Sequence, residues 1–174
     1  IPSFPYLTLR ATASSPAGPW TKHYTPEPFD ITPGTFYSAT ASPGHVVKQG
    51  NEYLQFFSST NSSGKRTIGI ARTEDLATAW TVDATPAFPV EEQIENSSLY
   101  FEPTNSTWFL FTNHIGISGG EYTDGVWVYW TTDLNNWDPA NKAVVLDGSN
   151  CTWSSKCIGM PSVTVVGNKL HIFY

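Results

Sequence analysis

Hydrophobic and polar residues alternate in short runs along the chain, and one such pattern occurs three times. Each copy contains an alternating run, a polar turn and a closing tryptophan. The copies are residues 7–20, 67–80 and 124–137, which end on Trp20, Trp80 and Trp137. These tryptophans lie 60 and then 57 residues apart. Alternation with period two predicts half-buried β-strands, and a repeat of this length in a strand-rich chain predicts stacked β units.

A second pattern precedes each closing one and predicts an inner hairpin. Its copies are residues 44–57, 97–111 and 161–174, and the first and third align without a gap. Their turns, Gly50-Asn51 and Gly167-Asn168, separate runs rich in Val, Phe and Tyr, which is typical of a hairpin. Chance similarity between short strands is the alternative, but two independent patterns keep the same order. We therefore predict an all-β fold, a β-propeller of four-stranded antiparallel blades.

The repeat divides the chain into one partial propeller domain over residues 1–174. We expect residues 1–41 to end one blade and its connection, 42–94 to form a complete blade, 95–158 to form a second complete blade and its connection, and 159–174 to start another. About three blades' worth of strands is present. A closed ring needs at least about four blades, so we expect the remaining blades from missing sequence or from a second chain.

Charge and hydropathy limit the expected partners. The net charge of −6 is scattered and no basic cluster occurs, which argues against nucleic acid and anionic membranes. No apolar run is long enough to predict a membrane span.

Cysteines and sequons point to a secreted protein. Cys151 and Cys157 lie in one predicted loop, and we expect a short disulfide, with free or metal-bound thiols as the alternative. The Asn-x-Ser/Thr triplets begin at Asn61, Asn96, Asn105 and Asn150. Asn61 and Asn105 fall at predicted hairpin tips, where a glycan is tolerated, and Asn150 is a third candidate; Asn96 is expected to be too buried.

Strand alternation sorts the polar residues between two edges of the propeller. The connections between blades and the loops between second and third strands share one edge, on which propeller sites are expected by analogy between folds. Its carboxylates are Glu27, Asp30, Asp83, Glu91, Glu92, Glu95, Glu121, Asp124, Asp138 and Asp147. Those expected on the opposite edge are Glu52, Glu74, Asp75, Glu102 and Asp133, of which Asp75 and Asp133 are expected to brace turns.

Glu95 is the candidate catalytic residue among these carboxylates. It directly precedes a predicted innermost strand, where a side chain can point into the channel, and the equivalent positions in the neighbouring blades are near Ser42 and Gly159. A carboxylate at one such position, with small residues at the others, indicates specialisation. The alternative is a loop acid or one that holds the turn by binding backbone amides.

Other side chains are candidates for binding or proton transfer. His45 starts its inner strand and aligns with Ser98 and Ser162, and a hydrogen-bonded structural role is its alternative. The further candidates for substrate binding are Ser42, His114, Trp153, Tyr37, Ser98 and Ser162. Most other aromatic residues, including the closing tryptophans, are expected to fill space between blades.

No cofactor or metal is expected. The histidines do not cluster with cysteines at zinc-ligand spacing. The sequence also contains no nucleophile elbow, phosphate loop or dinucleotide fingerprint.

Three stretches of the chain resemble a known group of enzymes. The run from Ile68 through Asp75-Leu76 to Trp80, together with the inner-strand starts Ser42–Val47 and Gly159–Val163, is similar to the five-bladed propeller glycoside hydrolases of families 43 and 32. The resemblance implies a five-bladed ring with carboxylates at several inner-strand starts. By position Glu95 matches the later glutamate, the general acid.

The sequence departs from that pattern at two places. The first-blade aspartate has no counterpart, and Ser42-Pro43 and Met160-Pro161 stand where an Asp-Pro is expected.

The resemblance implies a secreted glycoside hydrolase with a carbohydrate substrate, furanosides or pentosides being favoured. Its mechanism would use two carboxyl groups, whose separation decides retention or inversion. The alternatives are a glycan-binding propeller without catalysis and a phosphorylase or transferase on the same fold. The latter needs an anion site, and few basic residues, Lys22, Lys65, Arg66 and Lys156, are available.

Overall fold

The chain folds into antiparallel β-sheets. A computed structural model describes residues 5–25, 27–115, 125–147 and 159–174. Its elements are β1 (Arg10–Thr12), β2 (Thr21–His23), β3 (Thr40–Gln49), β4 (Glu52–Thr60), β5 (Arg66–Thr73), β6 (Thr81–Val82), the 3₁₀ turn η1 (Val90–Glu92), β7 (Ile94–Glu102), β8 (Thr107–His114), β9 (Val126–Thr131), β10 (Lys142–Leu146), β11 (Ser162–Val166) and β12 (Lys169–Phe173).

Two complete blades occupy the middle of the chain. Strands β3 to β6 form one four-stranded sheet and β7 to β10 form another, each in sequence order, while β1–β2 and β11–β12 form two-stranded sheets. The all-β class and the four-stranded antiparallel blades of a partial propeller are therefore confirmed. The predicted blade starts at residues 42 and 95 fall just inside β3 and β7.

Within the described part of the chain, no helix is long and apolar enough to cross a membrane.

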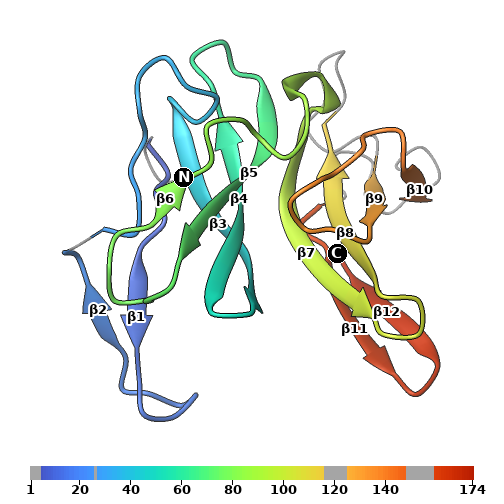
Figure 1. Cartoon of the computed structure of the whole chain (residues 1–174), viewed down its shortest axis with the longest axis horizontal. Helices are drawn as coiled ribbons and strands as arrows, with labels where there is room; N and C mark the ends of the chain where they lie inside the picture. Colours follow the sequence, from blue (N-terminus) through green and yellow to red (C-terminus); the bar gives the residue numbers. More distant parts are fainter. Residues whose placement is uncertain (1–4, 26, 116–124, 148–158) are drawn as a thin grey trace.

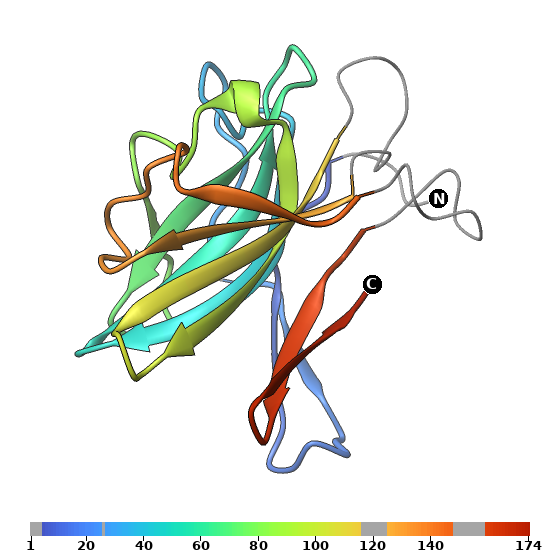
Figure 2. The same ribbon diagram turned by 90° about the vertical axis from the view of Figure 1, so that its right-hand side faces the viewer.

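The two edges of the propeller differ as strand alternation predicts. Figure 1 shows η1 and the β4–β5 loop at its upper end, and the β3–β4, β7–β8 and β11–β12 turns at its lower end. Figure 2 gives the same arrangement from the side. Because β3 and β7 both begin at the upper end, this end carries the starts of the innermost strands. We call it the site edge.

A β-bulge recurs at the start of both innermost strands. In the first blade the register shifts between Ser42 and His45, and in the second it shifts between Glu95 and Ser98. Repetition of the same bulge confirms that Glu95 corresponds to Ser42 and His45 to Ser98. A bulge re-aims side chains at the end of a strand, so both bulges turn the strand starts at the site edge.

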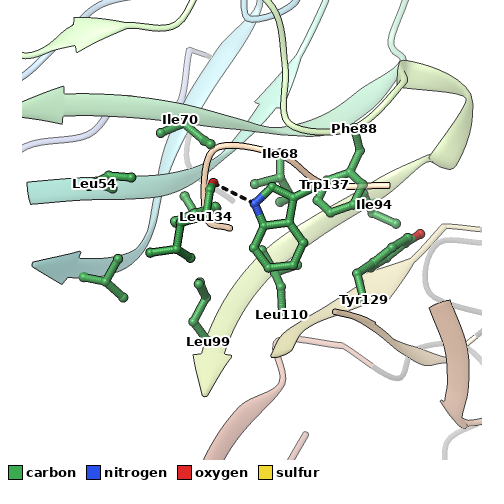
Figure 3. Packing of buried hydrophobic residues seen from close by; sticks show 12 residues of the cluster. Leu54, Ile68, Ile70, Phe88, Ile94, Leu99, Leu110, Tyr129, Leu134 and Trp137 are labelled. Atoms are coloured by element: carbon green, nitrogen blue, oxygen red, sulfur yellow. Dashed lines mark hydrogen bonds between the residues drawn. The ribbon is translucent and has the colours of Figure 1, made fainter. Parts of the chain in front are cut away.

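The main core lies between the two complete blades. Figure 3 shows Trp137 at its centre, with the indole N–H donating to the carbonyl of Leu134 at 3.0 Å. The Trp137 ring lies 5.5 Å from that of Phe88 and 5.8 Å from that of Phe56. Aliphatic residues of both blades surround these rings: Val47, Leu54, Ile68, Ile70, Ile94, Leu99 and Leu110. Trp137 therefore packs at the interface between the two complete blades.

The three closing tryptophans are not equally buried. Trp80 is half-buried against a second cluster that contains Phe29 and Phe57. Trp20 is 57% exposed, so the prediction that it fills space between blades is wrong. It adjoins the two-stranded β1–β2 hairpin, which lacks the further strands that cover the other two tryptophans in the part of the chain described.

Two aspartates brace equivalent turns, as predicted. The Asp75 carboxylate accepts from the Ala77 N–H at 2.8 Å, and the Asp133 carboxylate accepts from the Asn135 N–H at 3.0 Å. Each aspartate N–H in turn donates to a threonine hydroxyl two residues earlier. These carboxylates are turn residues and take no part in the site.

Asp83 does not lie on the site edge, contrary to the prediction. Its carboxylate accepts two hydrogen bonds from the Arg72 guanidinium, at 2.8 and 2.9 Å, and Arg72 also binds Glu52 beside the β3–β4 turn. The outer strand β6 is two residues long, so Asp83 remains next to the far half of β5. The network ties three strands together at that end.

Candidate functional site

Glu95 is held at the start of β7 by a residue of the neighbouring blade. Arg66, the first residue of β5, donates from Nη1 to Glu95 Oε2 at 3.2 Å. The side chains of Arg66 and Glu95 are 23% and 14% exposed. The ion pair therefore spans two blades on the site edge and is largely shielded from water.

Two asparagines extend this cluster towards the next hairpin. Asn96 Nδ2 donates to Asn113 Oδ1 at 2.8 Å and approaches Glu95 Oε1 at 3.5 Å. The Met160 N–H also donates to Asn113 Oδ1, at 3.1 Å. A backbone N–H can only donate, so this contact fixes the orientation of the Asn113 amide. Asn113 is fully buried, and its Nδ2 has no hydrogen-bond partner among the described residues.

The bulge brings Asn96 into this position. Asn96 has a positive φ of 59°, a left-handed conformation that asparagine tolerates better than most residues. Its N–H donates to the Ser58 hydroxyl of the first blade at 2.8 Å. Strand start, bulge and inter-blade bond together aim Glu95 at Arg66. The Asn96 amide is half-buried and hydrogen-bonded to Asn113, and the expectation that its sequon is too buried for a glycan stays a prediction.

The equivalent positions carry no charge. Ser42 is half-buried and pairs with Ser58, and Gly159 precedes the strand start of the last hairpin. Glu95 is thus the one carboxylate among these three positions.

His45 lies in β3 at the position equivalent to Ser98. Its N–H donates to the Ser97 hydroxyl of the second blade at 3.0 Å, and that hydroxyl donates to the Phe56 carbonyl. Burial lowers the pKa of His45 below its ordinary value of 6.5. The imidazole is thus held neutral near neutral pH, as a proton acceptor or a structural residue would be.

The pKa of His45 predicts a pH dependence of stability. Since the folded pKa lies below the unfolded one, the unfolded chain takes up the proton first, and stability falls as pH drops below 6.5 until the folded pKa is passed. We expect His45→Gln to lose less stability than the wild type between about pH 7.5 and about pH 5.5. Denaturant unfolding at both pH values measures the difference. An equal loss in both proteins would contradict the burial of this imidazole.

His114 is buried in the packing between the blades. Its ring stacks on Trp127 with centroids 4.0 Å apart and planes 4° from parallel. Lys142 Nζ lies 5.0 Å from the Trp127 ring centroid. With His114 and Lys142 against it, Trp127 is a packing residue, and the substrate contact proposed for His114 stays a prediction.

Glu92, next to this stack, is also engaged in the fold. It accepts from the Tyr129 hydroxyl at 2.6 Å and from Lys142 Nζ at 2.7 Å. Burial, with a further contribution from Glu92, raises the pKa of Tyr129. Glu92 therefore connects η1 to β9 and β10 and is no candidate for catalysis.

The remaining predicted contacts are dispersed. Ser98 is buried and accepts from the Val163 N–H at 3.2 Å, whereas Ser162 is exposed at the start of β11. Tyr37 is half-buried and packs against Phe36 and Phe57, with ring centroids 4.9 and 5.9 Å away. None of these three is among the residues that bind Glu95 in the contacts above. Their roles in binding stay predictions.

Several predicted features cannot be placed. Trp153, Cys151, Cys157 and Asn150 lie outside the described residues. Asn61 is described, and its Oδ1 accepts from the N–H groups of Ser63 and Lys65, each at 3.0 Å. Asn105 is exposed in the β7–β8 turn. Glycosylation and the disulfide stay predictions.

Sequence reasoning missed Arg66 as a partner of Glu95, and Asn113 altogether. Arg66 directly precedes residues 67–80, the second copy of the pattern that ends on a tryptophan, but nothing in that pattern shows that it reaches the next blade. Asn113 precedes His114 at the end of β8, and it is the strand register that marks it as a site-edge position, because Asn113 pairs with Glu95 as Ser58 pairs with Ser42. Within residues 5–25, 27–115, 125–147 and 159–174, no group of three His, Cys, Asp or Glu side chains could hold a metal ion.

Comparison with known proteins gives the fold. No protein-family model matches the chain, and no curated protein sequence does. Solved structures match over most of it. A GH43 β-xylosidase/α-arabinofuranosidase from a compost microbial metagenome superposes with a TM-score of 0.71 at 10% identity, covering 96% of this chain and 58% of that one.

Two further enzymes share the fold. An endo-arabinase from Bacteroides thetaiotaomicron matches with a TM-score of 0.59 at 14% identity, over 87% of this chain and 49% of its own. A GH32 β-fructofuranosidase from Bombyx mori matches with a TM-score of 0.54 at 15% identity, over 75% of this chain and 28% of its own. The chain thus has the fold of part of the five-bladed propellers of families 43 and 32. It spans 58% of the GH43 β-xylosidase/α-arabinofuranosidase, 49% of the endo-arabinase and 28% of the β-fructofuranosidase.

Proposed function

We propose that this chain carries part of the active site of a glycoside hydrolase. It would cleave glycosidic bonds in oligo- or polysaccharides, with furanosides or pentosides as the favoured substrates, and the protein would be secreted. The observation that carries the proposal is the position of Glu95, a shielded carboxylate at an innermost strand start on the site edge.

The chemistry requires two carboxyl groups across the scissile bond. One protonates the leaving oxygen, and the other activates water or attacks the anomeric carbon. Glu95 supplies one of them, with general acid as its proposed role. The second would come from another inner-strand start of the ring, and the separation of the two would decide retention, at about 5–5.5 Å, or inversion, at about 6.5–9.5 Å.

The matched structures support the substrate class. The compost GH43 enzyme was solved in complex with xylotriose, and a GH43_1 enzyme from Xanthomonas citri was solved with xylose. The latter matches with a TM-score of 0.67 at 8% identity, over 94% of this chain and 56% of its own. Pentose-containing substrates are thus the first to test.

The cations beside Glu95 weigh against a phosphorylase or transferase. Lys65 pairs with Glu91 at 3.2 Å and Arg66 pairs with Glu95 at 3.2 Å. A phosphate or an activated anionic donor would have to displace a carboxylate from either cation, so a glycosidase is the better proposal.

Hydrolysis of aryl α-L-arabinofuranosides, aryl β-D-xylosides and xylo-oligosaccharides tests the proposal on the full protein. We expect Glu95→Gln to lower kcat/KM by about 10²- to 10⁴-fold, since it removes a proton-transfer group. The matched control is Glu91→Gln, which alters an exposed, ion-paired acid on the same edge and is expected to keep wild-type activity. No hydrolysis by the wild type, together with oligosaccharide binding that survives Glu95→Gln, would instead identify a glycan-binding propeller.

A further inference from the structure

The geometry points to Arg66 as a positioning residue that sets the orientation of Glu95 from the neighbouring blade. This inference rests on the proposed function, because it assigns a second residue to the same site. Arg66 is the first residue of β5 and Glu95 the second of β7, so their contact depends on how the two blades pack.

Each of the two carboxylate oxygens of Glu95 contacts a different residue. Oε2 accepts from Arg66 of the first blade at 3.2 Å, and Oε1 faces Asn96 of the bulge at 3.5 Å. Asn96 is itself bound to Asn113, whose carbonyl oxygen also accepts from the N–H of Met160 beside the last hairpin. Contacts from both sides thus restrict rotation of the Glu95 side chain.

Burial distinguishes this ion pair from its neighbour in sequence. Arg66–Glu95 has side-chain exposures of 23% and 14%, whereas Lys65–Glu91 has exposures of 47% and 69% at the same distance of 3.2 Å. An exposed pair contributes little. A shielded pair is sensitive to loss of either partner, because the remaining charge is left poorly solvated. Arg66 is therefore more than a surface charge.

Acid–base catalysis is sensitive to such positioning. A misplacement of about 1 Å can lower the rate by about 10²-fold. We therefore expect Arg66→Met to lower kcat by about 10²-fold with little change in KM. Arg66→Lys, which keeps the charge but loses the planar fork, is expected to recover most of the loss, to within about tenfold of the wild type.

A double-mutant cycle separates positioning from a general structural effect. If Arg66 acts through Glu95, Arg66→Met changes residual activity by less than about twofold in the Glu95→Gln background. A structural defect would instead lower activity equally in both backgrounds. Lys65→Met is the matched control, since it breaks the adjacent exposed pair and is expected to leave kcat unchanged.

Thermal unfolding of the same variants gives a readout that is independent of activity. The Tm losses of Arg66→Met and Glu95→Gln are expected to add up to more than the loss of the double variant, because each single change leaves one shielded group without its partner. The losses of Lys65→Met and Glu91→Gln are expected to be small and additive.

The outcomes distinguish this inference from the proposed function. If Arg66→Met keeps wild-type kcat while Glu95→Gln is inactive, the inference is overturned and the proposed function stands. If both variants remain fully active, Glu95 is not catalytic and both fail. If the wild type cleaves none of the probes, the proposed function fails, and additive Tm losses for Arg66 and Glu95 would overturn the positioning as well.

Discussion

Replacing Gly44 by alanine is expected to destabilise the fold by about 4 kcal/mol or more, an unusually large effect for one added methyl group. A Cβ at this position would lie 1.8 Å from the carbonyl oxygen of Phe56 and 2.6 Å from the Ser97 hydroxyl. No real Cβ contact is this short. Phe56 belongs to the neighbouring strand β4 of the same sheet, so the clash can be relieved only by moving backbone.

The expected loss of stability is larger because the missing side chain of Gly44 leaves space for the Ser97 hydroxyl. Ser97, from the second blade, reaches the Phe56 carbonyl and also accepts from the N–H of His45. A methyl group on residue 44 would displace this hydroxyl and break both bonds. It would also shift the bulge from which the inner strand β3 continues. The substitution therefore acts on the strand and on the junction between blades together.

Gly69→Ala is the matched comparison. Its Cβ would meet the ring of Phe57 at 2.5 Å and that of Phe36 at 2.7 Å, which are side-chain atoms. Rings can move by repacking, so we expect a smaller loss of about 1–3 kcal/mol. Denaturant unfolding of both variants measures the two free energies. A loss for Gly44→Ala no larger than that for Gly69→Ala would show that the Ser97 junction is not as close as described.

The repeat in the sequence predicted the fold because it reflects both the burial of the strands and the register of the hairpins. Alternation along 44–57 and 97–111 reflects strands that bury one face against each neighbouring blade, and the turn residues Gly50-Asn51 fix the hairpin register. The same alignment paired His45 with Ser98 and Glu95 with Ser42, and the recurrent bulge confirms both pairs. The local sequence pattern therefore predicted which residues occupy equivalent positions in different blades.

Contacts between blades were not predictable in the same way. Arg66 and Glu95 lie 29 residues apart, and their contact depends on the angle between two sheets, which no local pattern encodes. Asp83 was misplaced because its strand, β6, is only two residues long, so that the chain at Asp83 still lies beside the far half of β5, bound to Arg72. Tyr37 packs against Phe57 because its connection folds back onto its own blade.

The closing tryptophans give a second large expected effect, with an internal control. Trp137→Ala is expected to cost about 3–5 kcal/mol, since it removes a large side chain from the centre of the main core. The indole is 7% exposed, packs edge-on against Phe56 and at a tilt against Phe88, and donates to the Leu134 carbonyl. Its loss leaves a cavity between two sheets that cannot easily close, because each blade is held in place by its own hydrogen bonds.

Trp20→Ala changes the same residue type at the same place in the repeat but at 57% exposure. We expect it to change stability by no more than about 0.5–1 kcal/mol, because exposed side chains contribute little to packing. Chemical denaturation followed by far-UV circular dichroism compares the two variants without relying on the fluorescence of the altered residue. A similar loss for both would mean that position in the repeat, and not burial between complete blades, sets the contribution of these tryptophans. A loss confined to Trp137 would show that the stability of this chain resides in the junction that also brings Arg66 to Glu95.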